Sequence, residues 1–222
     1  MDVSGVKADF LGHSGFLFNY KGKNIIVDPY RVSDAVPKAD LVLITHGHSD
    51  HCSIKDVQKI SKKGTVVLCS VDCQSSLMKV KGIELHIVAV NDLLDFGFIR
   101  LGCVPAYTFG KRHPKQEGWL GFVINFGKTI FYVAGDTDNI PEMQKLSGYG
   151  KKGNTFVAFL PVAGDDRVMD SYSAVKAAKV LNPALAIPMG YGSGVYGTEK
   201  DAQLFVDLCK QNGLNAVILP KI

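Results

Sequence analysis

A short histidine-rich run has the clearest chemical potential in this sequence. His46, His48 and His51 place three of the six histidines of the chain within six residues, and Asp50 stands between the last two. Neutral imidazoles and carboxylates are good ligands for zinc and other first-row metals. A run of the form H-x-H-x-D-H has enough donors for two neighbouring ions. The sequence therefore predicts a metal site here.

A surface loop that is rich in histidine by chance, or an expression tag, is the alternative explanation of this run. Its internal position, directly after the apolar stretch 41–44, excludes a tag. In an extended segment His46 and His48 face the same way because side chains alternate. A turn through Ser49 then redirects the two side chains that follow. We therefore interpret the side chains of this run as metal ligands.

The neighbouring segments indicate how the run is held. Residues 41–44 are a continuous apolar stretch, which is typical of a buried strand, so the histidines follow the C-terminal end of that strand. Residues 53–62 have apolar side chains at helical spacing. Ser53 and Asp56 can cap the start of this helix.

The pattern of elements changes along the chain. Strand-like runs dominate the first part, and helices alternate with strands from about residue 139. This order fits an α/β (α+β) fold in which helices cover two mixed sheets. The expected strands are 6–11, 15–20, 24–27, 41–44, 65–69, 85–90, 98–104, 119–126, 129–134, 155–160, 184–187 and 216–219, and the expected helices are 53–62, 140–146, 171–181 and 199–210.

Length and composition are those of a globular protein. With 222 residues, of which 46% are hydrophobic and 21% charged, the chain can bury one substantial core, so we expect a single domain over 1–222. The net charge of +4 is mild and its lysines are scattered. This balance argues against a nucleic-acid partner and is compatible with a small anionic substrate. The oligomeric state stays open.

The cysteine content and the lengths of the apolar runs indicate in which cellular compartment the protein is expected. The five cysteines are odd in number and lack the spacing of zinc ribbons or disulfide frameworks, so we expect reduced, mostly buried thiols. The first residues show no secretion signal, and no apolar run is long enough to span a bilayer. These features indicate a cytoplasmic protein without membrane association.

Over nearly its whole length the sequence resembles the metallo-β-lactamase superfamily, and within it the small metal-dependent hydrolases that include ascorbate-6-phosphate lactonase. The resemblance implies a four-layer αββα sandwich, the metallo-β-lactamase fold. It rests on the histidine-rich run and Ala134-Gly135-Asp136-Thr137, which are specific. Supporting segments are Leu11-Gly12-His13-Ser14-Gly15-Phe16, Ile26-Val27-Asp28-Pro29, His113-Pro114-Lys115, Leu160-Pro161-Val162 and Ile187-Pro188-Met189.

The resemblance also implies how two metal ions would be held. Zn²⁺ is the expected metal, with Mn²⁺ and Fe²⁺ as alternatives, because all three accept nitrogen and oxygen donors. The implied ligands are His46, His48 and His113 for a first ion, Asp50 and His51 for a second, and Asp136 as the bridge.

Several of these residues also have a plainer alternative. His113 can be an exposed loop residue, and Asp136 an ordinary turn residue. Asp28 would orient a ligating histidine by accepting its other N–H, or it is a simple turn residue before a proline. His13 would line the pocket as an acid or substrate-binding group, or it is a packed histidine. His86 is expected to pack or to lie at the surface.

One position departs from the family pattern. Family members usually carry a histidine after Ile-Pro-Met that completes the second metal site, whereas Gly190 follows Ile187-Pro188-Met189 here. Loss of a ligand should weaken metal binding by more than the roughly 10- to 100-fold typical of residues that only orient ligands. We therefore expect one tightly bound ion and a partial second site.

These features together predict a metal-dependent hydrolase. A bound ion makes hydroxide available near neutral pH and polarises the carbonyl or phosphoryl oxygen of an ester, lactone or phosphoester. Asp50 would orient the attacking water and move its proton. The alternative is a degenerate, non-catalytic member of the same fold that binds metal or ligand, and Gly190 is the feature in its favour.

Other enzyme classes gain less support. Residues 192–197 match the dinucleotide fingerprint G-x-G-x-x-G, but the acidic residue needed about twenty positions later is not found before Ile222. We expect instead a flexible glycine loop near the pocket. No G-x-S-x-G nucleophile elbow occurs, which argues against a serine hydrolase. The chain is also short for nuclease relatives that carry an inserted nucleic-acid-binding domain.

Overall fold

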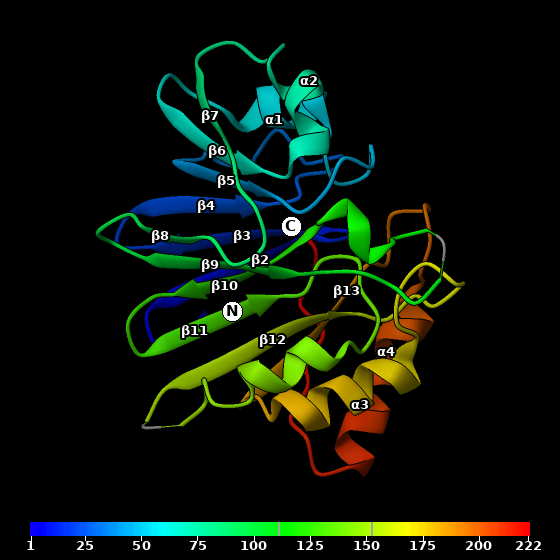
Figure 1. Cartoon of the computed structure of the whole chain (residues 1–222). Helices are drawn as coiled ribbons and strands as arrows, with labels where there is room; N and C mark the ends of the chain where they lie inside the picture. Colours follow the sequence, from blue (N-terminus) through cyan, green and yellow to red (C-terminus); the bar gives the residue numbers. More distant parts are fainter. Residues whose placement is uncertain (111, 152) are drawn as a thin grey trace.

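The computed structural model describes residues 1–110, 112–151 and 153–222, and these form two β-sheets with helices on their outer faces (Figure 1). The first sheet has seven strands in the order β1 to β7, and the second has six in the order β13-β12-β11-β10-β9-β8. Both sheets contain parallel and antiparallel pairs. The predicted architecture of two mixed sheets flanked by helices is therefore confirmed.

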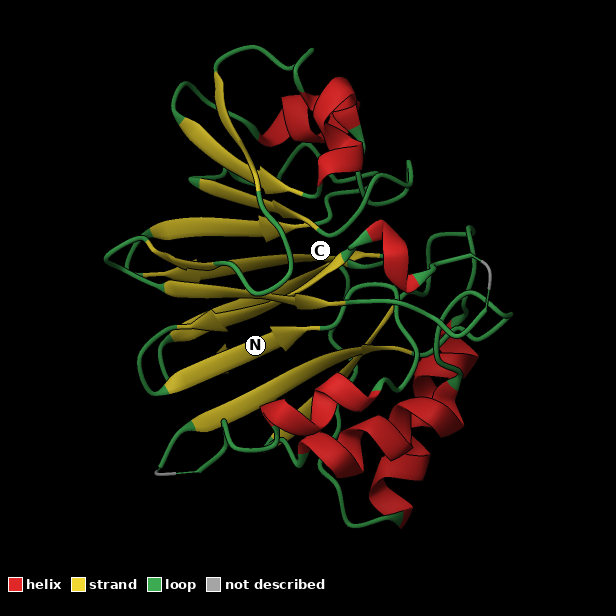
Figure 2. Ribbon diagram, in the orientation of Figure 1, coloured by secondary structure: helices red, strands yellow, loops and turns green. Residues whose placement is uncertain are grey.

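The first sheet begins antiparallel and ends parallel. Strands β1 to β4 pair antiparallel, whereas β4 to β7 pair in parallel. Helices α1 (Ile54–Ile60) and α2 (Gln74–Leu77) lie beside its parallel part (Figure 2). Its strands are β1 (Asp2–Val3), β2 (Val6–Gly12), β3 (Gly15–Tyr20), β4 (Lys23–Val27), β5 (Leu41–Ile44), β6 (Thr65–Cys69) and β7 (Ile83–Ile87).

The second sheet carries the longer helices. Helices α3 (Ser171–Leu181) and α4 (Glu199–Gln211) pack against each other and against β12 and β13, and the 3-10 helix η3 (Pro141–Leu146) packs on α3. Its strands are β8 (Leu93–Asp95), β9 (Arg100–Pro105), β10 (Leu120–Asn125), β11 (Thr129–Val133), β12 (Thr155–Pro161) and β13 (Leu185–Met189), and short 3-10 turns are η1 (Val71–Cys73) and η2 (Lys115–Glu117).

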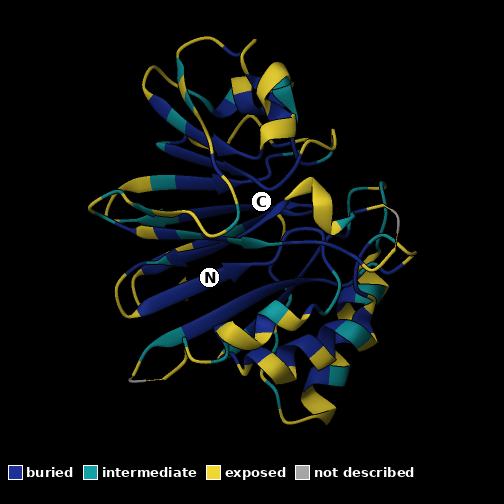
Figure 3. Cartoon of the chain, in the orientation of Figure 1, coloured by how far each residue is buried: buried dark blue, intermediate teal, exposed yellow. Residues whose placement is uncertain are grey.

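An aromatic layer joins the two sheets. Side chains alternate along β3, so Phe16 and Phe18 point to the second sheet while Leu17 joins the apolar cluster beneath α1. The Phe18 ring lies 5.1 Å from that of Phe131 and 5.3 Å from that of Phe159, at the separation that favours tilted aromatic pairs. Figure 3 shows these strands as the buried centre of the molecule. This packing fixes one sheet against the other.

The sandwich brings several strand ends to one edge. The carboxyl ends of β4, β5, β11, β12 and β13 lie together because these strands run parallel to their neighbours within each sheet. Loops that follow such ends can meet even when they are far apart in sequence, and ligands commonly bind there. The segment after β5 is the histidine-rich run.

Two expected elements are wrong. Residues 216–219 form no strand, since Ala216 makes only an isolated parallel bridge to Ala186. The bonds that Ala186 makes with Asn215 and Val217 cannot be followed by another, because Pro188, the next residue of β13 on that side, has no N–H to donate. Residues 140–146 form the 3-10 helix η3 and not an α-helix, because backbone bonds such as Met143 N–H to the Ile140 carbonyl join residues three apart.

Other expectations from composition agree with the structure. All five cysteines are buried and free in the part of the chain that is described. Ser53 caps α1 by accepting the N–H of Asp56, as its sequence pattern predicts. Within the described ranges, no helix combines the length and apolar character that crossing a bilayer requires.

Candidate metal centre

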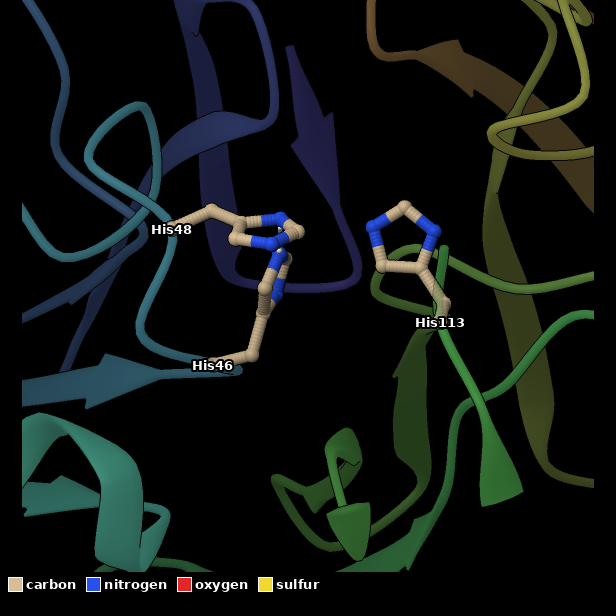
Figure 4. A group of neighbouring side chains, drawn as sticks. All are labelled: His46, His48 and His113. Carbon is tan, nitrogen blue, oxygen red and sulfur yellow. Dashed lines mark hydrogen bonds between the residues drawn. The ribbon is translucent and has the colours of Figure 1, made fainter. Parts of the chain in front are cut away.

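Three imidazoles from two distant segments meet at the shared sheet edge. His46 and His48 follow β5, and His113 lies in the connection between β9 and β10. Figure 4 shows the three rings directed toward a common point. His46 Nε2 lies 3.1 Å from His48 Nδ1, and one nitrogen from each of the three rings lies within 4.8 Å of the others. The structure thus brings together the three histidines assigned to the first ion.

Asp136, in the loop after β11, lies at the centre of the histidines. Its Oδ2 atom is 3.4 Å from His51 Nε2, 3.4 Å from His113 Nε2 and 4.0 Å from His46 Nε2. The side chain is only 2% exposed. A carboxylate in this place can be shared by ions on either side of it, which is the bridging position that the resemblance implies.

The donor set fits a divalent cation. Among the described residues, both ring nitrogens of His113 and Oδ1 of Asp136 are buried without a hydrogen-bond partner. Buried polar atoms left unpaired cost roughly 1–3 kcal/mol each, so such atoms normally have a partner. Imidazole nitrogen and carboxylate oxygen are the donors that Zn²⁺ and similar ions take. These residues could therefore hold a metal of that class.

Asp28 orients His51 from behind. Its Oδ2 accepts from His51 Nδ1 at 2.8 Å and from the Thr45 hydroxyl at 2.7 Å, while Oδ1 accepts the Thr45 N–H at 2.8 Å. With Nδ1 donating to Asp28, the other ring nitrogen, Nε2, is left facing Asp136. The structure therefore places Asp28 where it can fix the ring orientation of a ligating histidine.

His13 lies behind Asp50 and does not line the cavity. It adopts a left-handed backbone conformation after β2, with φ of +58°, and its side chain is fully buried. Its Nε2 lies 2.9 Å from Asp50 Oδ2, and its Nδ1 lies 3.0 Å from Ser193 Oγ. Both ring nitrogens are thus engaged. This geometry suits a group that positions Asp50 better than one that contacts substrate.

The buried charges set the pKa values of the cluster. Burial raises the pKa of Asp136, but His51 and His46 lower it more, and the net result lies well below its usual range. Burial lowers the pKa of His51, yet Asp136 and Asp28 raise it well above the usual value. Burial and the neighbouring His51 hold the pKa of His46 well below its usual range. His46 is therefore neutral, as a metal ligand must be.

Tyr196 is a site residue that the sequence did not indicate. It belongs to the glycine-rich segment 192–197, and its hydroxyl donates to Asp136 Oδ2 at 2.8 Å and lies 3.3 Å from His51 Nε2. Burial, followed by the charge of Asp136, raises the pKa of Tyr196 well above its usual value. The expectation that this glycine segment lies near the pocket agrees with the structure, and a polar aromatic residue inside it was the only available clue.

A cavity of about 370 Å³ opens onto the cluster. Its walls include the predicted site residues His48, Asp50, His113 and Asp136 together with Tyr196. Two arginines that the sequence did not single out, Arg112 and Arg167, complete the lining. By contrast, His86 is exposed on β7 and takes no part in the histidine groups, as expected.

Comparison with known proteins identifies the family. The model of the beta-lactamase superfamily domain matches residues 7–190. The chain is a member of the metallo-β-lactamase superfamily. Within this superfamily it belongs to the UPF0173 metal-dependent hydrolases. A member from Thermoplasma acidophilum is 32% identical over 86% of this chain and 85% of its own length, and one from Nanoarchaeum equitans is 32% identical over 97% of each.

Solved structures of superfamily members agree with this assignment. A protein from Parabacteroides distasonis, described as a metal-dependent hydrolase, is 29% identical and superimposes with a TM-score of 0.81 over 98% of this chain and 94% of its own. The predicted superfamily, its fold and the hydrolase class are therefore confirmed. The narrower resemblance to ascorbate-6-phosphate lactonase and the choice of Zn²⁺ stay predictions.

Replacing Asp28 by Asn tests its orienting role. The amide retains the shape but can present its NH₂ group to the His51 ring, so we expect affinity for the ion held by His51 to fall by roughly 10- to 100-fold. Metal titration against a competing chelator measures this. Asp40→Asn is the matched control, since Asp40 accepts a backbone N–H from Asn24 at the opposite end of β5. Equal affinity in the Asp28 variant would contradict the assignment.

Proposed function

We propose that this superfamily member is a metal-dependent hydrolase that acts on a small anionic ester, lactone or phosphoester. The observation that carries the proposal is the gathering of imidazoles around Asp136 at the base of a cavity whose lining includes two arginines. A bound ion of this type lowers the pKa of a coordinated water and polarises a carbonyl or phosphoryl oxygen. The proposed metal is Zn²⁺, with Mn²⁺ or Fe²⁺ as alternatives. The proposed ligands are His46, His48, His113, Asp50, His51 and the shared Asp136.

We assign the role of proton acceptor to Asp50. Its side chain is 16% exposed and lines the cavity, whereas the His13 behind it is fully buried. The bond from His13 holds one carboxylate oxygen, and burial raises the pKa of Asp50 less than His13 and His51 lower it. A lowered pKa makes this carboxylate a weaker base than a free aspartate, so the proposed transfer of a proton from an attacking water depends on its position at the cavity. His13 is then a positioning residue.

The two arginines favour a substrate with negative charge. Arg112 is exposed at the cavity, and the Arg167 guanidinium lies 5.5 Å from the Tyr196 ring centroid. A guanidinium offers paired donors that match the geometry of carboxylate and phosphate groups. A phosphate or carboxylate on the substrate could therefore be bound beside the ions while its ester bond faces Asp50.

A non-catalytic binding protein is the second candidate, and Gly190 favours it. The departure from the family pattern at this position removes a histidine expected at the second ion. Metal-dependent turnover separates the two candidates. Hydrolysis of generic lactone or phosphodiester probes that stops with a chelator and returns with added metal supports the enzyme. Ligand binding without such turnover supports the binding protein.

Asp50→Asn tests the proton-transfer role. Loss of the base should lower kcat by about 100- to 10,000-fold, the usual contribution of general base catalysis. Affinity for the ion bound by His46, His48 and His113 should change only a few-fold, because Asp50 is absent from that group. Parallel measurement of turnover and of metal content checks both. An active variant, or one that has lost the first ion, would exclude this role.

Arg112→Gln tests the substrate charge. Hydrogen bonds to charged groups contribute about 1.5–3 kcal/mol, so KM for an anionic probe should rise roughly 10- to 150-fold. KM for a neutral ester of the same leaving group should hardly change. Arg100→Gln is the control, because Arg100 is exposed on β9 and pairs with Asp95. An equal effect on both probes would argue against anion recognition.

A further inference from the structure

The space beside Gly190 is filled by Tyr196. A Cβ atom added at Gly190 would have Tyr196 Cε2 as its nearest neighbour at 3.5 Å, and Pro161 Cβ next at 3.8 Å. The Tyr196 ring thus lies against the side from which a residue 190 side chain would extend. The phenol group reaches the same cluster that the missing histidine would have reached.

The loop is built to hold Tyr196 in this place. A Cβ at Gly197 would clash with the Gly190 carbonyl oxygen, so only glycine permits the chain to return so closely to Gly190. The Gly192 N–H also donates to the Gly197 carbonyl at 3.3 Å. His13 packs edge-on against the Tyr196 ring, with centroids 4.7 Å apart. The loop therefore closes on itself and directs the hydroxyl to the metal-ligand cluster.

The oxygen of Tyr196 lies at the spacing of a ligand. Donor atoms that surround a tetrahedral ion at about 2.0–2.1 Å are roughly 3.3 Å from one another. The Tyr196 oxygen is 3.3 Å from His51 Nε2 and 2.8 Å from Asp136 Oδ2, and the last two atoms are 3.4 Å apart. Asp50 Oδ2 lies 3.9 Å from His51 Nε2. The Tyr196 oxygen, His51 Nε2 and Asp136 Oδ2 can therefore face one ion, and Asp50 belongs to the neighbouring group that it forms with His51 and His13.

We propose that Tyr196 is the metal ligand that replaces the histidine missing at Gly190. The second ion is then held by His51, Asp136 and the Tyr196 oxygen, with Asp50 beside His51 as a further donor, an inference that rests on the proposed metal-dependent function. The oxygen binds as phenolate, and its proton passes to solvent when the ion enters. Because this loss of the Tyr196 proton opposes metal binding, the second site is weaker than the first. In the alternative, the Tyr196 side chain occupies the second site and keeps a metal ion out of it.

Titration of the whole protein with Zn²⁺ against a chromophoric chelator tests the proposal. The natural chain should bind two equivalents, the first more tightly. Tyr196→Phe should keep the first with unchanged affinity and bind the second more than about 100-fold more weakly, since removal of a ligand exceeds the effect of an orienting residue. Tyr191→Phe is the matched control: it is a buried tyrosine nearby whose ring stacks on Phe10, 5.0 Å away.

Two further measurements make the test specific for a phenolate ligand. The second equivalent of Zn²⁺ should produce the ultraviolet difference absorption of tyrosinate in the natural chain and in Tyr191→Phe but not in Tyr196→Phe. A Gly190→His, Tyr196→Ala double variant, in which removal of the ring frees the space beside residue 190, should restore the second equivalent. The positive φ of +77° at this position strains any side chain, and histidine is among the non-glycine residues found there most often.

The outcomes separate this proposal from the function itself. If Tyr196→Phe binds the second ion as tightly as the natural chain or more tightly, Tyr196 is a plug and the proposal is overturned. A natural chain that binds only one equivalent overturns it as well, and the first ion still supports the proposed function. Absence of any tight Zn²⁺ binding to the natural chain would overturn both.

Discussion

The site depends on placing a carboxylate among imidazoles where water is largely excluded. Asp136 is 2% exposed, and its charge faces the surrounding imidazoles and the Tyr196 hydroxyl. In a buried setting an uncompensated charge is strongly destabilising, so the site needs a proton on His51 or cations among these donors. Metal binding and proton release are therefore coupled here. Buried atoms of His113 and Asp136 without hydrogen-bond partners, noted above for the described residues, agree with this requirement.

The sandwich positions this cluster, because its aromatic core fixes the strand ends from which the proposed ligands follow. His46 follows β5 in one sheet and Asp136 follows β11 in the other, so their separation depends on how the sheets pack. Packing through Phe18 and Phe131 sets that relation far from the site. Behind the proposed ligands, Asp28 contacts His51 and His13 contacts Asp50. The loops carry the polar side chains of the site, and the packed core fixes the positions of those loops.

Much of this arrangement could be predicted from the sequence because local patterns encode it. The alternating and apolar runs locate most strands, and the spacing of the histidine-rich run after β5 points to metal ligands. Position 190 shows the limit of such patterns. The absence of a histidine at this position predicts that a metal donor is missing. Tyr196 nevertheless reaches the cluster, because the glycine loop folds back onto Gly190.

Other details depend on tertiary contacts that no local pattern contains. Residues 216–219 have the composition of a strand, yet only Ala216 pairs with the sheet. His13 sits in a glycine-flanked turn that suits a pocket residue equally well, and its placement behind Asp50 follows from contacts with the distant Ser193. No local sequence pattern distinguishes Arg112 and Arg167, and the fold brings both to the wall of the same cavity.

The proposed function requires one ion to sit among the imidazoles of His46, His48 and His113. Anomalous diffraction from crystals grown with Zn²⁺ tests this most directly. We expect a strong peak within about 2.0–2.3 Å of one nitrogen from each of the three rings. A peak at another place, or no peak among these rings in fully occupied crystals, would contradict the metal centre.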